Sequence, residues 1–103
     1  MTMRILENNT LMKVHVAYYD NFWTLRPEVT RRGEQIQEKE IRFRGGLEDC
    51  TFALQLLNAK DADIAPAGRL RRPYPALAKD LMEGFSKYIW VTINDWKKVY
   101  KYI

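Results

Sequence analysis

Apolar and polar residues alternate near the start of the chain. In LMKVHVAYY, residues 11–19, every second side chain from Met12 onward is apolar, whereas His15 and Tyr19 fall on the opposite side. A period of two is typical of a β-strand with one buried face. We therefore expect a half-buried strand over residues 11–19.

Two further alternating or apolar runs follow this strand. Asp20-Asn21 separates it from FWTLRPEV, residues 22–29, and two residues that tolerate a left-handed backbone predict a tight hairpin turn. Pro27 cannot donate to a ladder, which places the second strand at an edge or ends it early. KEIRFR, residues 39–44, alternates again. Together these runs predict a three-stranded antiparallel meander over about residues 11–44.

Beyond Gly45-Gly46 the apolar spacing lengthens to three and four residues, which predicts helices. The first helix is expected at about residues 47–60. Cys50 shares its apolar face with Leu47 and Leu54, so we expect the thiol to be a buried small hydrophobe.

The same spacing runs from Leu77 to the end of the chain and predicts a helical region at about residues 75–103, with Pro75 in its first turn. Thr92 or Asn94 can cap a helix, and a break there would divide the region in two. The apolar seam expected to bury against the sheet contains Phe85, Tyr88, Trp96 and Val99.

These elements predict a single α+β domain over residues 1–103, with a small three-stranded antiparallel meander followed by two or three helices. The chain has 103 residues, of which 47% are hydrophobic, enough for one core. A basic, proline-rich connector over residues 61–74 joins the two helical regions.

Charge changes this picture only mildly. The sequence has 17 basic and 13 acidic residues, a net charge of +4, and residues 61–103 supply +3 of it, with 8 basic against 5 acidic residues. A basic field of this size is compatible with a nucleic-acid or acidic-protein partner and also with simple solubility.

The sequence contains few residues that could catalyse a reaction. His15 is the only histidine and Cys50 the only cysteine, so neither a disulfide nor a usual zinc site is available, and we expect no catalytic residue, cofactor or metal. No apolar run reaches the length of a membrane span, which predicts no membrane contact and a cytoplasmic location.

The connector is the strongest candidate for a partner-binding segment. Its prolines disfavour regular structure and keep it partly extended, and its basic residues are all arginine, the residue suited to bidentate contacts. A solvated link between helices is the alternative. The residues expected to bind a protein partner are Pro66, Arg69, Arg71, Arg72, Pro73 and Tyr74.

Two other features point to specific ligands. Arg42 and Arg44 alternate on the outer side of their strand, and with Tyr19 they suggest direct contact with DNA or RNA, an alternative to charged protection of a sheet edge. Pro66 lies between small residues in DIAPAGR, which suggests a prolyl isomerase as a further partner.

A short basic chain without an active-site motif, with possible starts at Met1, Met3 and Met12, resembles the small accessory proteins that bacteriophages encode to redirect host enzymes. Phage anti-RecBCD modulators, which bind a host recombination nuclease, are similar in size and character. This resemblance implies a non-enzymatic protein in the host cytoplasm that binds and modulates a nucleic-acid-processing complex.

Overall fold

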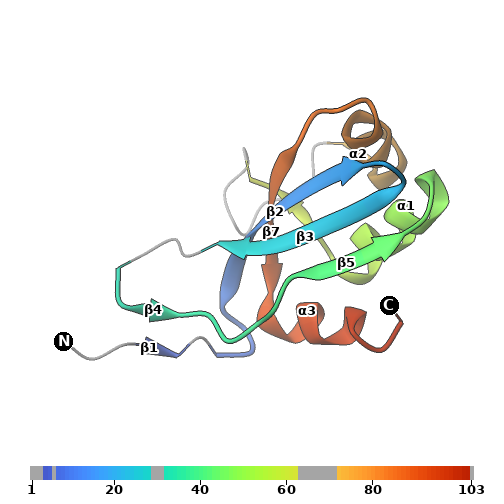
Figure 1. Cartoon of the computed structure of the whole chain (residues 1–103). Helices are drawn as coiled ribbons and strands as arrows, with labels where there is room; N and C mark the ends of the chain where they lie inside the picture. The colour runs from blue at the N-terminus through green and yellow to red at the C-terminus, as the bar shows by residue number, and fades with distance from the viewer. Residues whose placement is uncertain (1–3, 6, 29–31, 63–71, 103) are drawn as a thin grey trace.

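The structure is a computed structural model that describes residues 4–5, 7–28, 32–62 and 72–102. Its main element is a five-stranded antiparallel sheet, here called the main sheet, with the strand order β5-β3-β2-β7-β6 (Figure 1). The strands of the main sheet are β2 (Leu11–Tyr19), β3 (Phe22–Glu28), β5 (Ile41–Arg44), β6 (Lys60–Asp61) and β7 (Lys87–Thr92).

Three helices accompany this sheet in the described part of the chain: α1 (Leu47–Leu56), α2 (Tyr74–Met82) and α3 (Ile93–Val99). A separate two-stranded parallel ladder joins β1 (Arg4–Ile5) to β4 (Glu34–Gln35). The predicted α+β class is therefore correct.

The predicted meander forms one half of the main sheet. β2 and β3 are joined by a two-residue turn in which Asp20 and Asn21 have φ values of 52° and 65°, the left-handed conformation that such a hairpin requires. β5 then pairs with β3 from Phe22 to Leu25 only, so Pro27 lies beyond this ladder and interrupts no bond to β5. The three-stranded description is incomplete, because β7 and β6 extend the sheet on the other side of β2.

The helical region predicted at residues 75–103 is wrong in its middle. α2 ends at Met82, Gly84 turns the chain with a φ of 100°, and β7 then pairs along β2. Ile89 and Val91 alternate into the core with β-branched side chains, which fit a pleated sheet better than a helix. The pairing of β7 with β2 therefore makes this segment a strand, although its apolar residues are also spaced as in a helix.

The two ends of this region follow the prediction more closely. Pro75 lies in the first turn of α2, where its missing N–H breaks no helical bond. Thr92 caps α3, and its Oγ1 accepts a hydrogen bond from the Asp95 N–H at 3.1 Å. The predicted apolar seam is half right: Trp96 and Val99 are buried, whereas Phe85 and Tyr88 are exposed.

α1 is shorter than predicted, since it ends at Leu56 and Lys60 belongs to β6. A left-handed Asn58, with a φ of 51°, turns the chain away from the helix axis toward the sheet. Cys50 is buried as expected, but Leu47 is partly exposed.

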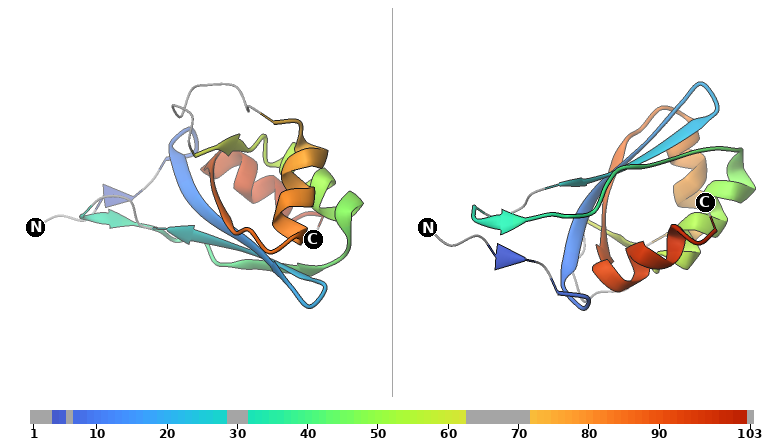
Figure 2. Two further views of the ribbon diagram at one scale, coloured as in Figure 1. Left: turned by 90° about the horizontal axis from the view of Figure 1, so that it is seen from above. Right: turned by 60° about the horizontal axis from the view of Figure 1, so that its bottom comes forward.

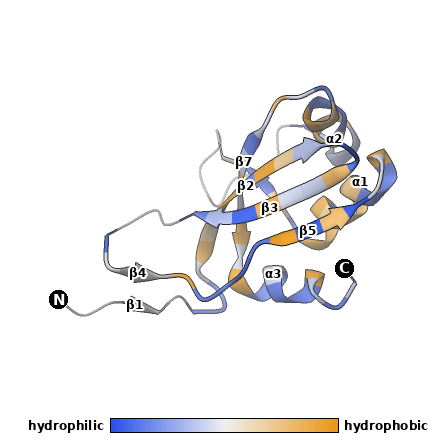
Figure 3. Cartoon of the chain, in the orientation of Figure 1, coloured by the Kyte–Doolittle hydropathy of each residue, from blue (hydrophilic) through white to orange (hydrophobic). Residues whose placement is uncertain are grey.

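All three helices cover one face of the main sheet (Figure 2). The core between the two layers includes Val14 and Val16 of β2, Trp23 of β3 and Trp96 of α3, each fully buried. Figure 3 shows that the connection before β5, residues 37–40, is mainly hydrophilic, in contrast to the apolar positions of the long strands. No helix of the described residues covers the opposite face of the main sheet.

Candidate binding surfaces

The predicted partner-binding segment is described only at its C-terminal end. Pro66, Arg69 and Arg71 lie outside the described residues. Arg72 forms an ion pair with Asp80 of α2, and Pro73 is exposed at the start of that helix.

Tyr74 contributes to packing rather than to an open surface. Its ring packs against the core, and its hydroxyl donates a hydrogen bond to the Ala59 carbonyl at 3.2 Å. Burial, and secondarily the charge of Asp95, raises the pKa of the Tyr74 hydroxyl. This residue therefore anchors the first turn of α2 to the segment between α1 and β6.

The second candidate surface is the uncovered face of the main sheet, here called the open face. Strand register places Arg44, Phe22 and Tyr19 in one row across β5, β3 and β2. The guanidinium carbons of Arg42 and Arg44 lie 4.5 and 4.7 Å from the centre of the Phe22 ring. Tyr19 is 84% exposed at the end of this row. The structure thus brings Arg42, Arg44 and Tyr19 onto one surface.

The middle of the open face contains residues that were not predicted to form a binding surface. His15 of β2 pairs with Tyr88 of β7, and their rings are 5.0 Å apart. The Lys13 ammonium lies 4.5 Å from the centre of the Tyr88 ring. In the next row Trp90 stands between Lys13 and Lys60. Tyr88 and Trp90 were missed because β7 was predicted to be helical.

A hollow of about 320 Å³ adjoins the open face beside β7. Lys13 and Tyr88 belong both to the open face and to this hollow. The hollow is lined by Lys13, Asp61, Ala62, Ser86, Lys87 and Tyr88.

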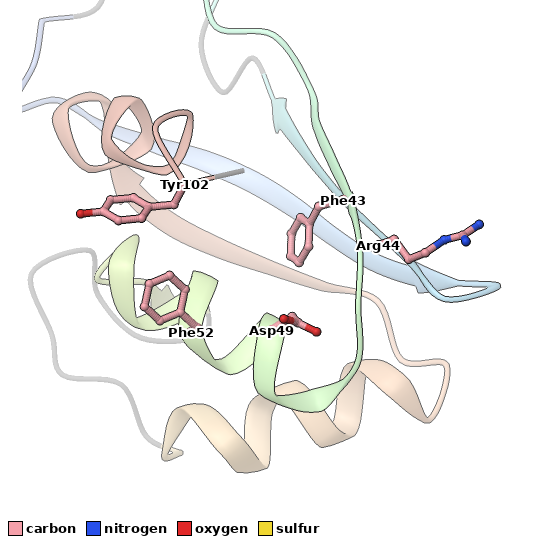
Figure 4. A pocket seen from close by; sticks show the side chains of 5 residues that line it. All are labelled: Phe43, Arg44, Asp49, Phe52 and Tyr102. Atoms are coloured by element: carbon pink, nitrogen blue, oxygen red, sulfur yellow. The ribbon is translucent and has the colours of Figure 1, made fainter.

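The third candidate surface, here called the aromatic hollow, lies between β5, α1 and the C-terminal end. It has a volume of about 310 Å³ and is lined by Phe43, Arg44, Asp49, Phe52 and Tyr102 (Figure 4).

Two exposed rings form one side of the aromatic hollow. Phe52 and Tyr102 meet edge to face with their centroids 6.0 Å apart, and they are 51% and 65% exposed. Phe43 points in from β5, whereas the Arg44 guanidinium extends away from the hollow (Figure 4). Large rings left this exposed on a small domain are typical of a contact surface.

Asp49 provides the negative charge of the aromatic hollow. Its Oδ2 accepts a hydrogen bond from the Gly46 N–H at 2.9 Å, which fixes the carboxylate at the start of α1. A β-carbon at Gly45 would come within 2.4 Å of the same oxygen, so only glycine permits this close approach. The backbone therefore holds a carboxylate at one end of a hollow that three aromatic rings also line.

The described residues contain no group of three or more His, Cys, Asp or Glu side chains that could hold a metal ion. Burial raises the pKa of the Cys50 thiol from 9.0 to about 12, so the thiol stays protonated and unreactive at neutral pH. Within the described ranges, no helix is long and apolar enough to cross a membrane.

Comparisons with known proteins were made at the level of family, sequence and structure. No protein-family model, curated protein or solved structure matches this chain.

Proposed function

We propose that this protein is a non-enzymatic binding protein that docks on a nucleic-acid-processing enzyme of the host cell. The observation that carries the proposal is the aromatic hollow, which is lined by the rings of Phe43, Phe52 and Tyr102 and by a fixed carboxylate, Asp49, at one end (Figure 4). No catalytic step is part of this role.

The chemistry of the hollow favours a protein partner that offers a basic side chain. Aromatic faces attract a guanidinium or ammonium group, and a neighbouring carboxylate adds a charge-assisted hydrogen bond. Its volume of about 310 Å³ accommodates the end of one arginine or lysine side chain with its stem. A nucleic-acid phosphate is a poor occupant, because Asp49 would repel it.

Two considerations point to a nucleic-acid-processing enzyme as the partner. Such enzymes hold the nucleic-acid backbone with exposed arginines and lysines, which are the side chains that the hollow accepts. The resemblance of the sequence to phage accessory proteins supports the same class of target. The predicted cytoplasmic location belongs to this proposal.

The proposal also includes the partner contacts that were predicted for the connector. Pro66, Arg69 and Arg71 lie outside the described residues, and their contacts with a partner, including a prolyl isomerase at Pro66, stay predictions. Of the described contacts, Arg72 and Pro73 are exposed at the start of α2, whereas Tyr74 acts through packing. Direct binding of DNA or RNA, the other role predicted from the sequence, would use the open face.

Affinity capture from a bacterial lysate tests this function, with captured proteins identified by mass spectrometry. Asp49→Asn retains the acceptor for the Gly46 N–H but removes the charge, and Phe52→Ala removes one exposed ring. We expect each change to abolish or strongly reduce capture of a nucleic-acid-processing enzyme.

Matched controls remove similar groups elsewhere. Glu48→Gln neutralises the neighbouring carboxylate in the same turn of α1, and Phe85→Ala removes a ring that is 61% exposed but does not line the hollow. Both controls should capture the enzyme as the unchanged protein does. Equal losses in the controls and the hollow variants would refute the proposed site.

A further inference from the structure

We infer that the open face of the main sheet binds single-stranded nucleic acid. This surface is separate from the one assigned to the protein partner, except that Arg44 touches both. The inference goes beyond the proposed function, because it gives the protein a direct contact with nucleic acid.

The register of the strands arranges the outward side chains in rows. Arg44, Phe22 and Tyr19 form one row. Two rows further along β2, Arg26, His15 and Tyr88 lie side by side. Neighbouring outward residues on a strand are about 7 Å apart, a separation comparable with that of successive phosphates in an extended single strand. The open face therefore repeats cationic and aromatic groups at a spacing that a single strand can follow.

Charge on the open face strongly favours a polyanion. The outward positions of the five strands of the main sheet include five basic side chains, and Glu28 is the acidic one among them. Glu28 accepts hydrogen bonds from Arg26 at 3.1 and 3.2 Å, so these two charges offset each other and four basic side chains are left in excess. The basic residues are Lys13, Arg26, Arg42, Arg44 and Lys60.

The aromatic residues distinguish a single strand from a duplex. Tyr19 is 84% exposed at the end of the row that contains Arg44, and Tyr88 is 43% exposed with the Lys13 ammonium 4.5 Å from its ring centre. Bases stack on such rings only when they are unpaired, which is how sheet surfaces bind single-stranded nucleic acid without sequence preference. Lys13, which lies over Tyr88, and Arg42, which lies over Phe22, can form ion pairs with phosphates while bases stack on the two rings.

The hollow beside β7 continues the basic surface of the open face at one edge of the main sheet. Lys13 and Lys87 outnumber its single carboxylate, Asp61, which is 8% exposed and engaged in an interaction of its own. A single-stranded nucleic acid that crosses the open face past Tyr88 would therefore reach further positive charge in this hollow.

Fluorescence anisotropy with a labelled 15-residue oligothymidine, and with a duplex of the same length as a comparison, tests the inference. We expect the single strand to bind more tightly than the duplex at 50 mM salt. The double variant Lys13→Ala and Arg42→Ala should weaken this binding at least tenfold and reduce the slope of log K against log salt by about 1.4, for two lost phosphate contacts.

Tyr19→Ala provides a second variant with a different signature. Loss of one stacked base should weaken binding about tenfold while the salt slope stays unchanged. Tyr19 is too exposed to support the core, so its removal should leave the circular dichroism spectrum as it is.

The matched control is the double variant Lys79→Ala and Lys101→Ala, which removes the same charge from α2 and from the segment after α3. It should bind the oligonucleotide almost as well as the unchanged protein does. Tighter binding of the duplex, no binding at 50 mM salt, or an equal loss in the control would overturn the inference.

The open-face variant also keeps this inference separate from the proposed function. Lys13 and Arg42 do not line the aromatic hollow, so their replacement should leave enzyme capture from nuclease-treated lysate unchanged. If the variant instead loses the captured enzyme and the unchanged protein does not bind oligothymidine, the open face is a protein interface and the inference fails.

Discussion

Phe52 and Tyr102 meet edge to face at 6.0 Å, although one lies in α1 and the other follows α3 near the end of the chain. Both rings remain more than half exposed after this contact. The contact brings together two distant segments at a surface, and it forms the wall on which the proposed docking site depends.

Phe52→Ala separates the binding role of this ring from any structural role. Because the ring is 51% exposed, its loss should lower the free energy of unfolding by less than about 1.5 kcal/mol, the upper range for an aromatic pair. Partner capture should fall strongly. Urea denaturation measures the stability, and a loss above about 3 kcal/mol, typical of a core cavity, would assign Phe52 to the core instead.

Trp96→Ala, unlike Phe52→Ala, should strongly reduce the stability of the fold. Trp96 is fully buried in α3, and its Nε1–H donates to the Tyr100 hydroxyl at 3.3 Å, which in turn donates to the Lys39 carbonyl at 2.6 Å. Its removal should cost about 3–5 kcal/mol in urea denaturation. A cost below about 1 kcal/mol would show that α3 does not close the core as described.

Thr92→Ala tests the boundary between β7 and α3. The change removes the oxygen that accepts the Asp95 N–H and should lower the free energy of unfolding by about 1 kcal/mol, whereas Thr92→Ser should retain most of it. Thermal denaturation compares the two. Equal stability of the alanine and serine variants would mean that the cap contributes little.

Cys50 gives a prediction about pH. Its pKa is raised from 9.0 to about 12 by burial, so above pH 9 the thiol ionises in the unfolded chain but stays protonated in the folded one. The contribution of Cys50 to stability should therefore be complete below pH 9 and fall by up to about 1.4 kcal/mol per pH unit above it.

The variant Cys50→Ala isolates this effect from other groups that titrate at high pH. The difference in unfolding free energy between the two proteins should shrink as pH rises from 8 to 10 if burial disfavours the thiolate. A difference that does not change with pH would contradict the raised pKa.

The arginines of the connector should matter for binding and not for folding. Arg72 is half exposed and its ion pair with Asp80 should contribute at most about 1 kcal/mol. The triple variant Arg69→Ala, Arg71→Ala and Arg72→Ala should remain folded but bind the partner less tightly. Unfolding of the variant would make these residues structural, and unchanged binding would place the contact elsewhere.

Local patterns predicted the parts of the fold that depend on neighbouring residues. The alternation in residues 11–19 and the left-handed tolerance of Asp20-Asn21 were sufficient for β2 and its hairpin, because both features act over a few residues. Likewise, Thr92 carried the signal for a separate last helix.

The parts that failed depend on contacts distant in sequence. Tyr88, Thr92 and Trp96 are four residues apart, which fits a helix, and only the pairing of β7 with β2 decides in favour of a strand. The aromatic hollow was missed for the same reason. Phe43, Phe52 and Tyr102 come from three segments, and no local pattern indicates that they meet.

The most direct test of the proposed function is the amount of nucleic-acid-processing enzyme captured from bacterial lysate with and without nuclease digestion, at low and at raised salt. A protein contact through the aromatic hollow predicts equal capture in digested and undigested lysate, retained capture at raised salt, and loss of capture with Phe52→Ala but not with Phe85→Ala. Capture that disappears after digestion, or that persists in the Phe52→Ala variant, would contradict docking through this hollow.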